Sequence, residues 1–336
     1  MIVRKGANMF KKKLLSLISS LLVISFAMCG CASTLAPTQK LTPVESAAKT
    51  SKISQIYAFG DSYSDNGESM RISKEILKLS KPIEGASILP SDPKNNLYWN
   101  GRWSDGPTAV ENLATDLHVK LTDYAVGGAK SGKDNYYDWL NQYQDTGVLG
   151  QINAYKVKLA GAKADSKALY FIFISANDFF YHMDYTTPGT IKELSKQTIQ
   201  NIKTAVSELS GLGAKNFMVV NVTDLTVVPW VVANSQTNEA KEFTTDVNSA
   251  LPGDMKSLGN TLHVKIILFD HTAVSKMIRS NPAKYGLKEI NQSFEHTYPD
   301  IIAGKGNPDQ YYFWDEWHPT RVVHKIVGAE MAKALK

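Results

Sequence analysis

The sequence is nearly free of cysteine: Cys29 and Cys31 are the only two among 336 residues. Both lie directly after an uncharged, mostly apolar run, residues 14–28, which follows five basic residues in the first thirteen. This order of a basic segment, an apolar run and small residues is typical of a secretory signal. Because a chain processed here keeps at most one thiol, we exclude an intramolecular disulfide and a metal site built from several cysteines.

A long hydrophobic run is also lacking. A membrane-spanning helix needs about 20 apolar residues, whereas residues 14–28 are fewer and include four serines. We therefore interpret residues 1–30 as a signal peptide. The segment Gly30-Cys31-Ala32 resembles the processing site of bacterial lipoproteins, which implies a lipid on Cys31 and an exported protein anchored to a bacterial membrane, periplasmic or at the cell surface. The alternative is a secreted chain, cut at Ala32 or later and not lipidated.

An excess of one charge sign is missing once this leader is set aside. The formal charge of +5 comes from residues 1–30, and the remainder carries 32 basic and 32 acidic residues. A nucleic-acid partner is not expected from this balance, and no long basic run suggests a membrane-binding patch. Contact with a membrane would instead depend on the N-terminal lipid anchor.

The rest of the chain divides into two parts. Residues 31–52 are small, polar and interrupted by proline, which predicts a flexible tether. Residues 53–336 are expected to form one α/β domain, because short runs that are apolar on both faces alternate with segments of helical pattern. The predicted strands are residues 53–59, 119–126, 168–175, 216–222 and 264–270. The predicted helices are residues 107–117, 191–209, 238–258 and 321–335. Long loops are expected over residues 71–103 and 281–314.

Two short motifs near opposite ends of this domain carry reactive groups. Ser62 lies in Gly60-Asp61-Ser62 directly after the first predicted strand, where open α/β sheets bind ligands. A serine hydroxyl becomes a good nucleophile only when a base removes its proton. His318 supplies such a base, and Asp315, three residues earlier, can hold its ring in the required orientation. The elbow Gly-x-Ser-x-Gly of α/β hydrolases is absent from the sequence.

These motifs belong to five blocks that match, in order, the GDSL family of lipases and esterases, also called SGNH hydrolases. The blocks are Phe-Gly-Asp-Ser at 59–62, Gly-Arg-Trp-Ser-Asp-Gly-Pro at 101–107, Asp-Tyr-Ala-Val-Gly-Gly-Ala at 123–129, Ser-Ala-Asn-Asp at 175–178 and Trp-Asp-Glu-Trp-His-Pro-Thr at 314–320. The resemblance implies a three-layer α/β sandwich around a five-stranded, mainly parallel sheet.

The same resemblance assigns expected roles to five residues. Ser62 would be the nucleophile, His318 the general base and acid, and Asp315 its orienting partner. The backbone N–H groups of Ser62 and Gly128 and the side-chain amide of Asn177 would form the oxyanion hole. Such donors, already in place where charge develops on the carbonyl oxygen, are each worth about 3–4 kcal/mol to the transition state.

Two departures from the family pattern concern the walls of the site. Tyr63 replaces the common leucine after the nucleophile, and Ser175-Ala176 replaces the usual glycines before Asn177. Phe179 and Phe180 follow closely and, with Tyr63, are the expected substrate-binding residues. The longer form of the pattern resembles bacterial phospholipases, lysophospholipases and glycerophospholipid acyltransferases, which implies a lipid or other ester substrate, a possible transferase activity and no cofactor.

Other readings of the sequence lead to different functions. A short-chain or carbohydrate acetyl esterase would use the same five residues, and a surface lipoprotein with a dead site would bind without catalysis. Residues 127–134 nearly match a phosphate-binding loop, but Asp134 stands where a serine or threonine is required. The six histidines other than His318 show no metal-ligand spacing, so a metal site is not expected.

Overall fold

The computed structural model of the protein describes residues 53–90, 97–298 and 305–336. The predicted signal peptide, the tether and Cys31 lie outside these residues. Among the described helices, none combines the length and apolarity needed to cross a membrane.

Five parallel strands form the central sheet in the order β2-β1-β3-β4-β5. Their bounds are Gln55–Gly60 (β1), Lys120–Asp123 (β2), Leu169–Phe173 (β3), Asn216–Val220 (β4) and Lys265–Phe269 (β5). Each lies within one of the predicted apolar runs apart from Gly60, one residue beyond its run. All five residues of β3 are buried, because helices cover both faces of the sheet. The predicted five-stranded parallel sheet is therefore confirmed.

Eleven α-helices occur in the described part of the chain. They are α1 (Glu68–Ile76), α2 (Ala109–Leu117), α3 (Asp138–Asn141), α4 (Val148–Leu159), α5 (Ala176–Tyr185), α6 (Ile191–Leu212), α7 (Pro229–Ala233), α8 (Thr237–Leu262), α9 (His271–Ser280), α10 (Phe294–Thr297) and α11 (Arg321–Ala334). The four predicted helices correspond to α2, α6, α8 and α11. The predicted loop at residues 71–103 instead begins inside α1.

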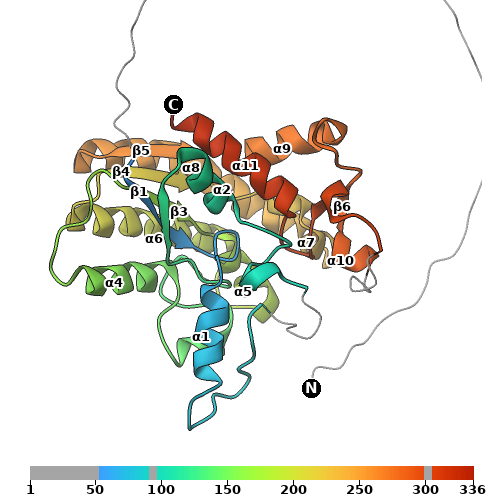
Figure 1. Ribbon diagram of the computed structural model, residues 1–336, viewed down its shortest axis with the longest axis horizontal. Coiled ribbons are helices and arrows are strands. Elements are labelled where there is room, and N and C mark those ends of the chain that lie inside the picture. Colours follow the sequence, from blue (N-terminus) through green and yellow to red (C-terminus); the bar gives the residue numbers. More distant parts are fainter. Residues whose placement is uncertain (1–52, 91–96, 299–304) are drawn as a thin grey trace, which may run out of the picture. The chain divides into compact units, whose positions relative to one another are not determined.

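The helices form the two outer layers of a three-layer sandwich. On one side α2 packs against α11, and on the other α6 packs against both α4 and α8 (Figure 1). This division follows from right-handed crossovers, because the connection from β1 to β2 runs in the opposite direction across the sheet from the later connections. The order reverses between β1 and β3, and the carboxyl ends of these two strands mark the place where such sheets bind ligands.

A second, two-stranded parallel sheet pairs β6 (Glu289–Ser293) with β7 (Tyr311–Phe313). The chain turns directly after β7, where the N–H of Trp314 donates to the carbonyl of His318 at 2.7 Å and the N–H of Thr320 donates to the carbonyl of Tyr312 at 2.9 Å. Residues 314–320 therefore form a tight loop that leads into α11.

Candidate active site

The serine turn begins where β1 ends. The side-chain amide of Gln151 binds both backbone polar groups of Gly60. It accepts from the Gly60 N–H at 2.9 Å and donates to the Gly60 carbonyl at 2.8 Å. A Cβ at this position would lie 2.5 Å from the carbonyl oxygen of Phe173, so only glycine fits beside β3. The carbonyl of Asp61 then accepts from the N–H groups of Ser64 and Asp65, both at 3.0 Å. This turn presents Ser62 at the carboxyl edge of the sheet.

Ser62, His318 and Asp315 form one hydrogen-bonded chain. The Nε2 atom of His318 lies 2.8 Å from the Oγ of Ser62, and its Nδ1 lies 2.7 and 2.9 Å from the two carboxylate oxygens of Asp315. Asp315 is completely buried, and 8% of Ser62 is exposed. With Nδ1 donating to the carboxylate, Nε2 is the acceptor for the serine proton.

Several donors besides the imidazole converge on the Asp315 carboxylate. Its Oδ1 accepts the backbone N–H groups of Trp317 at 2.8 Å and His318 at 2.7 Å, and its Oδ2 accepts the hydroxyl of Tyr98 at 2.8 Å. A buried carboxylate stays charged only when such hydrogen bonds replace its lost hydration. The arrangement therefore holds a fixed negative charge behind His318.

The three expected oxyanion donors line the same cavity. Gly128 has a φ of 79°, and a Cβ there would lie 2.4 Å from the Oδ1 of Asn135, so the turn requires glycine. Among the described residues, neither the N–H of Ser62 nor that of Gly128 has an acceptor. The side-chain N–H of Asn177, at the start of α5, donates to the carbonyl of Ala129 at 3.1 Å.

Two buried carboxyl groups brace the loops that carry these donors. Asp178 accepts the hydroxyl of Ser131 at 2.7 Å and its N–H at 3.0 Å, which ties α5 to the glycine loop. Asp61 accepts the N–H of Tyr63 at 3.0 Å inside the serine turn. Burial raises the pKa of Asp178 to about 6 and that of Asp61 to about 7.

The cavity above Ser62 has a volume of about 340 Å³ and is largely aromatic. It is lined by Ser62, Tyr63, Tyr98, Trp103, Gly128, Tyr136, Tyr137, Ala176, Asn177, Phe180, Trp230, Trp317 and His318. Two of the three predicted substrate-binding residues, Tyr63 and Phe180, are therefore in its wall.

The prediction for Phe179 is wrong. Its side chain is completely buried and packs against Phe243 of α8, with ring centroids 5.7 Å apart. The reason is the helical period: residues 177 and 180 are three apart and share a face of α5, whereas residue 179 points away from that face. The sequence suggested proximity along the chain, but a helix turns neighbouring residues in different directions.

Most of the other aromatic wall residues are not assigned to the site by the sequence alone. Tyr98 lies in the pair Tyr98-Trp99, and Tyr136 and Tyr137 lie in an aromatic cluster at 136–139; such clusters suit core packing as well as an acyl-chain groove. Trp230 comes from α7 and packs against Trp317 in a tilted arrangement, with ring centroids 4.8 Å apart. No local signal near Trp230 could have identified it, because its place depends on how α7 packs against the histidine loop.

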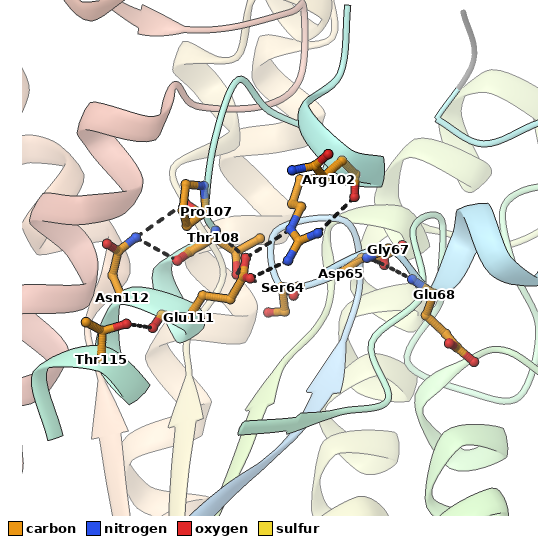
Figure 2. A network of polar contacts seen from close by, with 11 residues as sticks. Ser64, Asp65, Gly67, Glu68, Arg102, Pro107, Thr108, Glu111, Asn112 and Thr115 are labelled. Carbon is orange, nitrogen blue, oxygen red and sulfur yellow. Dashed lines mark hydrogen bonds and ion pairs between the residues drawn. The ribbon is translucent and has the colours of Figure 1, made fainter. Parts of the chain in front are cut away.

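Arg102 of the Gly-Arg-Trp block does not line the cavity. It forms an ion pair with Glu111, which we call the bracket. The guanidinium of Arg102 bonds both carboxylate oxygens of Glu111, at 2.5 and 3.3 Å, and donates to the carbonyl of Asn100 at 2.8 Å (Figure 2). Glu111 in turn accepts the N–H of Thr108 at 2.9 Å as the capping box of α2. The bracket fixes the segment that carries Trp103, whose ring lies 5.4 Å from that of His318.

Two further histidines lie behind the site. His271 and His324 are buried and contact the ring of Tyr63, with centroids 6.1 and 6.2 Å away. Burial lowers their pKa values to about 4 and about 3. Within the described residues, no group of three histidine, cysteine or carboxylate side chains is arranged to hold a metal ion.

Comparison with known proteins identifies the family of the chain. The family profile described as GDSL-like Lipase/Acylhydrolase matches residues 56–331. The thermolabile hemolysin of Vibrio parahaemolyticus is 26% identical over 310 residues, covering 86% of this chain and 66% of the hemolysin. The phosphatidylcholine-sterol acyltransferase of Aeromonas hydrophila is 24% identical over 332 residues, covering 86% and 92% of the two chains.

Among solved structures, a putative GDSL-like lipase from Parabacteroides merdae is similar, with a TM-score of 0.44 and 14% identity over 85% of this chain and 98% of that one. The profile match spans the sheet, the serine turn and the histidine loop described above. The protein therefore belongs to the GDSL-like lipase and acylhydrolase family and is a carboxylic ester hydrolase of that family.

Proposed function

We propose that this protein is a lipase that cleaves the acyl esters of phospholipids or lysophospholipids through an acyl-enzyme at Ser62. The observation that carries the mechanism is the hydrogen-bonded chain from Asp315 through His318 to Ser62. Ser62 and His318 line an aromatic cavity, and Gly128 and Asn177 line the same cavity.

In the proposed first half-reaction, the Oγ of Ser62 attacks the carbonyl carbon while Nε2 of His318 takes the hydroxyl proton. The negative charge on the carbonyl oxygen is met by the N–H groups of Ser62 and Gly128 and by the Asn177 amide. Asp315 stabilises the imidazolium that forms. Collapse of the intermediate breaks the bond to the alcohol, which leaves with the proton from His318.

In the second half-reaction, His318 takes a proton from water, which attacks the acyl-enzyme and releases the fatty acid with Ser62 restored. Transfer would follow the same path with the hydroxyl of another alcohol in place of water. The two outcomes differ only in which nucleophile reaches the ester bond of the acyl-enzyme.

The dimensions and lining of the cavity support an acyl chain over an acetyl group. A cavity of about 340 Å³ lies within the range of sites for ligands much larger than acetate. Its aromatic walls favour apolar groups, while the hydroxyl and indole N–H groups suit an ester at the boundary with water. The A. hydrophila relative bears the name of an enzyme that acts on phosphatidylcholine.

The test is release of fatty acid from phosphatidylcholine, lysophosphatidylcholine and a short-chain nitrophenyl ester by the unmodified protein and by Ser62→Ala. Lipid hydrolysis that is lost in the variant supports both the site and the substrate. Activity on the short ester alone would retain Ser62 but reject the lipid substrate. Lipid hydrolysis that survives in Ser62→Ala would reject the mechanism.

We also propose that the mature chain is exported and held at a bacterial membrane by a lipid on Cys31. The support is the basic and apolar leader followed by Gly30-Cys31-Ala32. Cys31→Ser should move the enzyme from the membrane fraction to the soluble fraction, whereas the matched control Cys29→Ser should not. If both variants moved to the soluble fraction equally, or if neither did, the result would count against a lipid on Cys31.

A further inference from the structure

The catalytic carboxylate has a donor that comes from a distant part of the chain. The hydroxyl of Tyr98 donates to the Oδ2 of Asp315 at 2.8 Å, across 217 residues of sequence. The same oxygen also receives the Nδ1–H of His318 at 2.7 Å. Tyr98 therefore shares an acceptor atom with the imidazole that activates Ser62.

From this contact we propose that Tyr98 is a positioning residue of the esterase reaction, which holds the Asp315 carboxylate in place and sets how strongly it attracts the proton on His318. The proposal rests on the serine mechanism and does not depend on the lipid substrate. Tyr98 also lines the substrate cavity, so the group that tunes the carboxylate lies within reach of a bound substrate.

The segment around Tyr98 is held from several sides. The N–H of Trp99 donates to the carbonyl of Ser104 at 3.0 Å, and the hydroxyl of Ser104 donates to the carbonyl of Pro319 at 2.7 Å, directly after His318. The ring of Tyr98 packs on Trp103, with centroids 6.0 Å apart. A hydroxyl carried on a fixed segment can restrict the carboxylate at little cost in entropy.

The bracket of Arg102 and Glu111 anchors this segment to α2 (Figure 2). Both side chains of the pair are largely buried, at 16 and 17% exposure, so the ion pair is poorly screened by water. Arg102 also donates to the carbonyl of Asn100, in the turn that follows Tyr98. The bracket thereby ties the segment that carries Tyr98 to the start of α2.

The direction of the electrostatic effect follows from the hydrogen bond. A hydroxyl that donates to the carboxylate withdraws part of its negative charge and weakens its hold on the imidazolium proton. Burial and the negative charge of Asp315 raise the pKa of Tyr98 above its ordinary value, so the hydroxyl keeps its proton throughout the working pH range. Without this donor, the imidazolium form gains stability and the carboxylate loses one of its restraints.

The first experiment compares Tyr98→Phe with Tyr137→Phe on a short-chain nitrophenyl ester across pH. Tyr137 lines the same cavity and lies within the field of Asp315, but its hydroxyl makes no hydrogen bond to that carboxylate. In Tyr98→Phe, kcat should fall about tenfold because the Asp315 carboxylate loses a restraint on its position. The acid limb of the kcat/KM profile should move upward by about 0.5–1 pH unit because the imidazolium form gains stability. In Tyr137→Phe, the acid limb should stay in place, whatever happens to KM.

A double-mutant cycle tests whether Tyr98 acts through Asp315. In an Asp315→Asn background, Tyr98→Phe should lower kcat by less than about twofold, because the carboxylate that the hydroxyl holds in place is gone. Equal tenfold losses in both backgrounds would show that Tyr98 acts elsewhere. An unchanged kcat and acid limb in Tyr98→Phe alone would overturn the proposal.

A second variant keeps the proposal testable if Tyr98→Phe does not fold. Glu111→Gln weakens the bracket without touching the cavity, and it should shift the acid limb in the same direction by a smaller amount. A shift in the opposite direction, or none, would overturn the link between the bracket and the carboxylate. Because all assays use a short ester, a failure here is distinct from a failure of the lipid proposal.

Discussion

The two halves of the catalytic chain are built in different ways. The serine turn follows a central strand, and its glycine is pressed between the carbonyl of Phe173 and the side chain of Gln151. The histidine loop lies after the small β6–β7 sheet, and side chains from residues 98–105 hold it from outside. The main sheet positions the serine turn, whereas hydrogen bonds between segments far apart in the sequence position the histidine loop.

This difference predicts which property each half controls. A change beside Gly60 alters the packing of two core strands, so it should affect folding before chemistry. A change around Asp315 removes a charge or a donor from a buried loop outside the main sheet, so it should affect turnover while the sheet stays intact. Changes at Asn177 and at the two buried histidines should fall between these two cases. They therefore test whether effects on folding and effects on turnover can be separated.

The largest effect is expected for Asp315→Asn. The amide is similar in shape but lacks the charge that stabilises the imidazolium, and kcat should fall about 10⁴-fold. The thermal midpoint should change little, as measured by circular dichroism. Glu316→Gln is the matched control, since it neutralises the neighbouring carboxylate and should change kcat by less than about threefold. Similar losses in both variants would refute a specific role for Asp315.

A smaller loss is expected for Asn177→Ala, which removes one donor from the oxyanion hole. The value of kcat should fall by about 10²–10³ with little change in KM, because the donor acts on charge that develops in the transition state. Asn177→Asp should be worse than alanine, since it places a carboxylate beside the developing oxyanion. A higher activity for the aspartate variant would argue against this assignment.

On the serine side, Gly60→Ala should destabilise the protein by about 3 kcal/mol, because its Cβ would lie 2.5 Å from the carbonyl of Phe173. Gly211→Ala is the control: it lies in α6, is exposed and has no atom within 4 Å of its added Cβ. It should stabilise the protein by about 0.5–1 kcal/mol. Urea unfolding measures both, and equal midpoints would remove the packing argument.

The smallest effect concerns pH. The pKa of His324 is lowered from 6.5 to about 3 in the folded chain, so below pH 6.5 only the unfolded chain gains a proton there, and stability is lost as pH falls. His324→Leu should flatten the fall in unfolding free energy between pH 6.5 and 4 by up to about 1.4 kcal/mol per pH unit.

Unfolding in urea at pH 7 and pH 5 provides the measurement. Asp61 acts with the opposite sign, because its raised pKa of about 7 favours the folded state at low pH and loses that contribution as pH rises. The slope of unfolding free energy against pH must therefore be compared between the variant and the unmodified protein. An identical slope would mean that the unfolded chain gains no extra proton at this histidine.

Much of the fold was open to prediction because its strongest signals are local. The short apolar runs predicted the five strands, since a parallel strand covered on both faces must be apolar throughout. Helices α2, α6, α8 and α11 were predicted from their patterns, whereas the other described α-helices were not. Among those, the aromatic residues of α5 favour no single face. That omission also explains the error at Phe179, whose direction depends on the helix.

By itself, the sequence determined the order of the blocks, the strand pattern and the types of reactive residues, because these properties belong to short segments. Tertiary structure alone decided that Trp230 and Tyr98 reach the cavity and that Tyr98 donates to Asp315. Such contacts join residues more than 80 positions apart. Their geometry depends on how the segments pack, and that packing leaves no periodic or local trace in the chain.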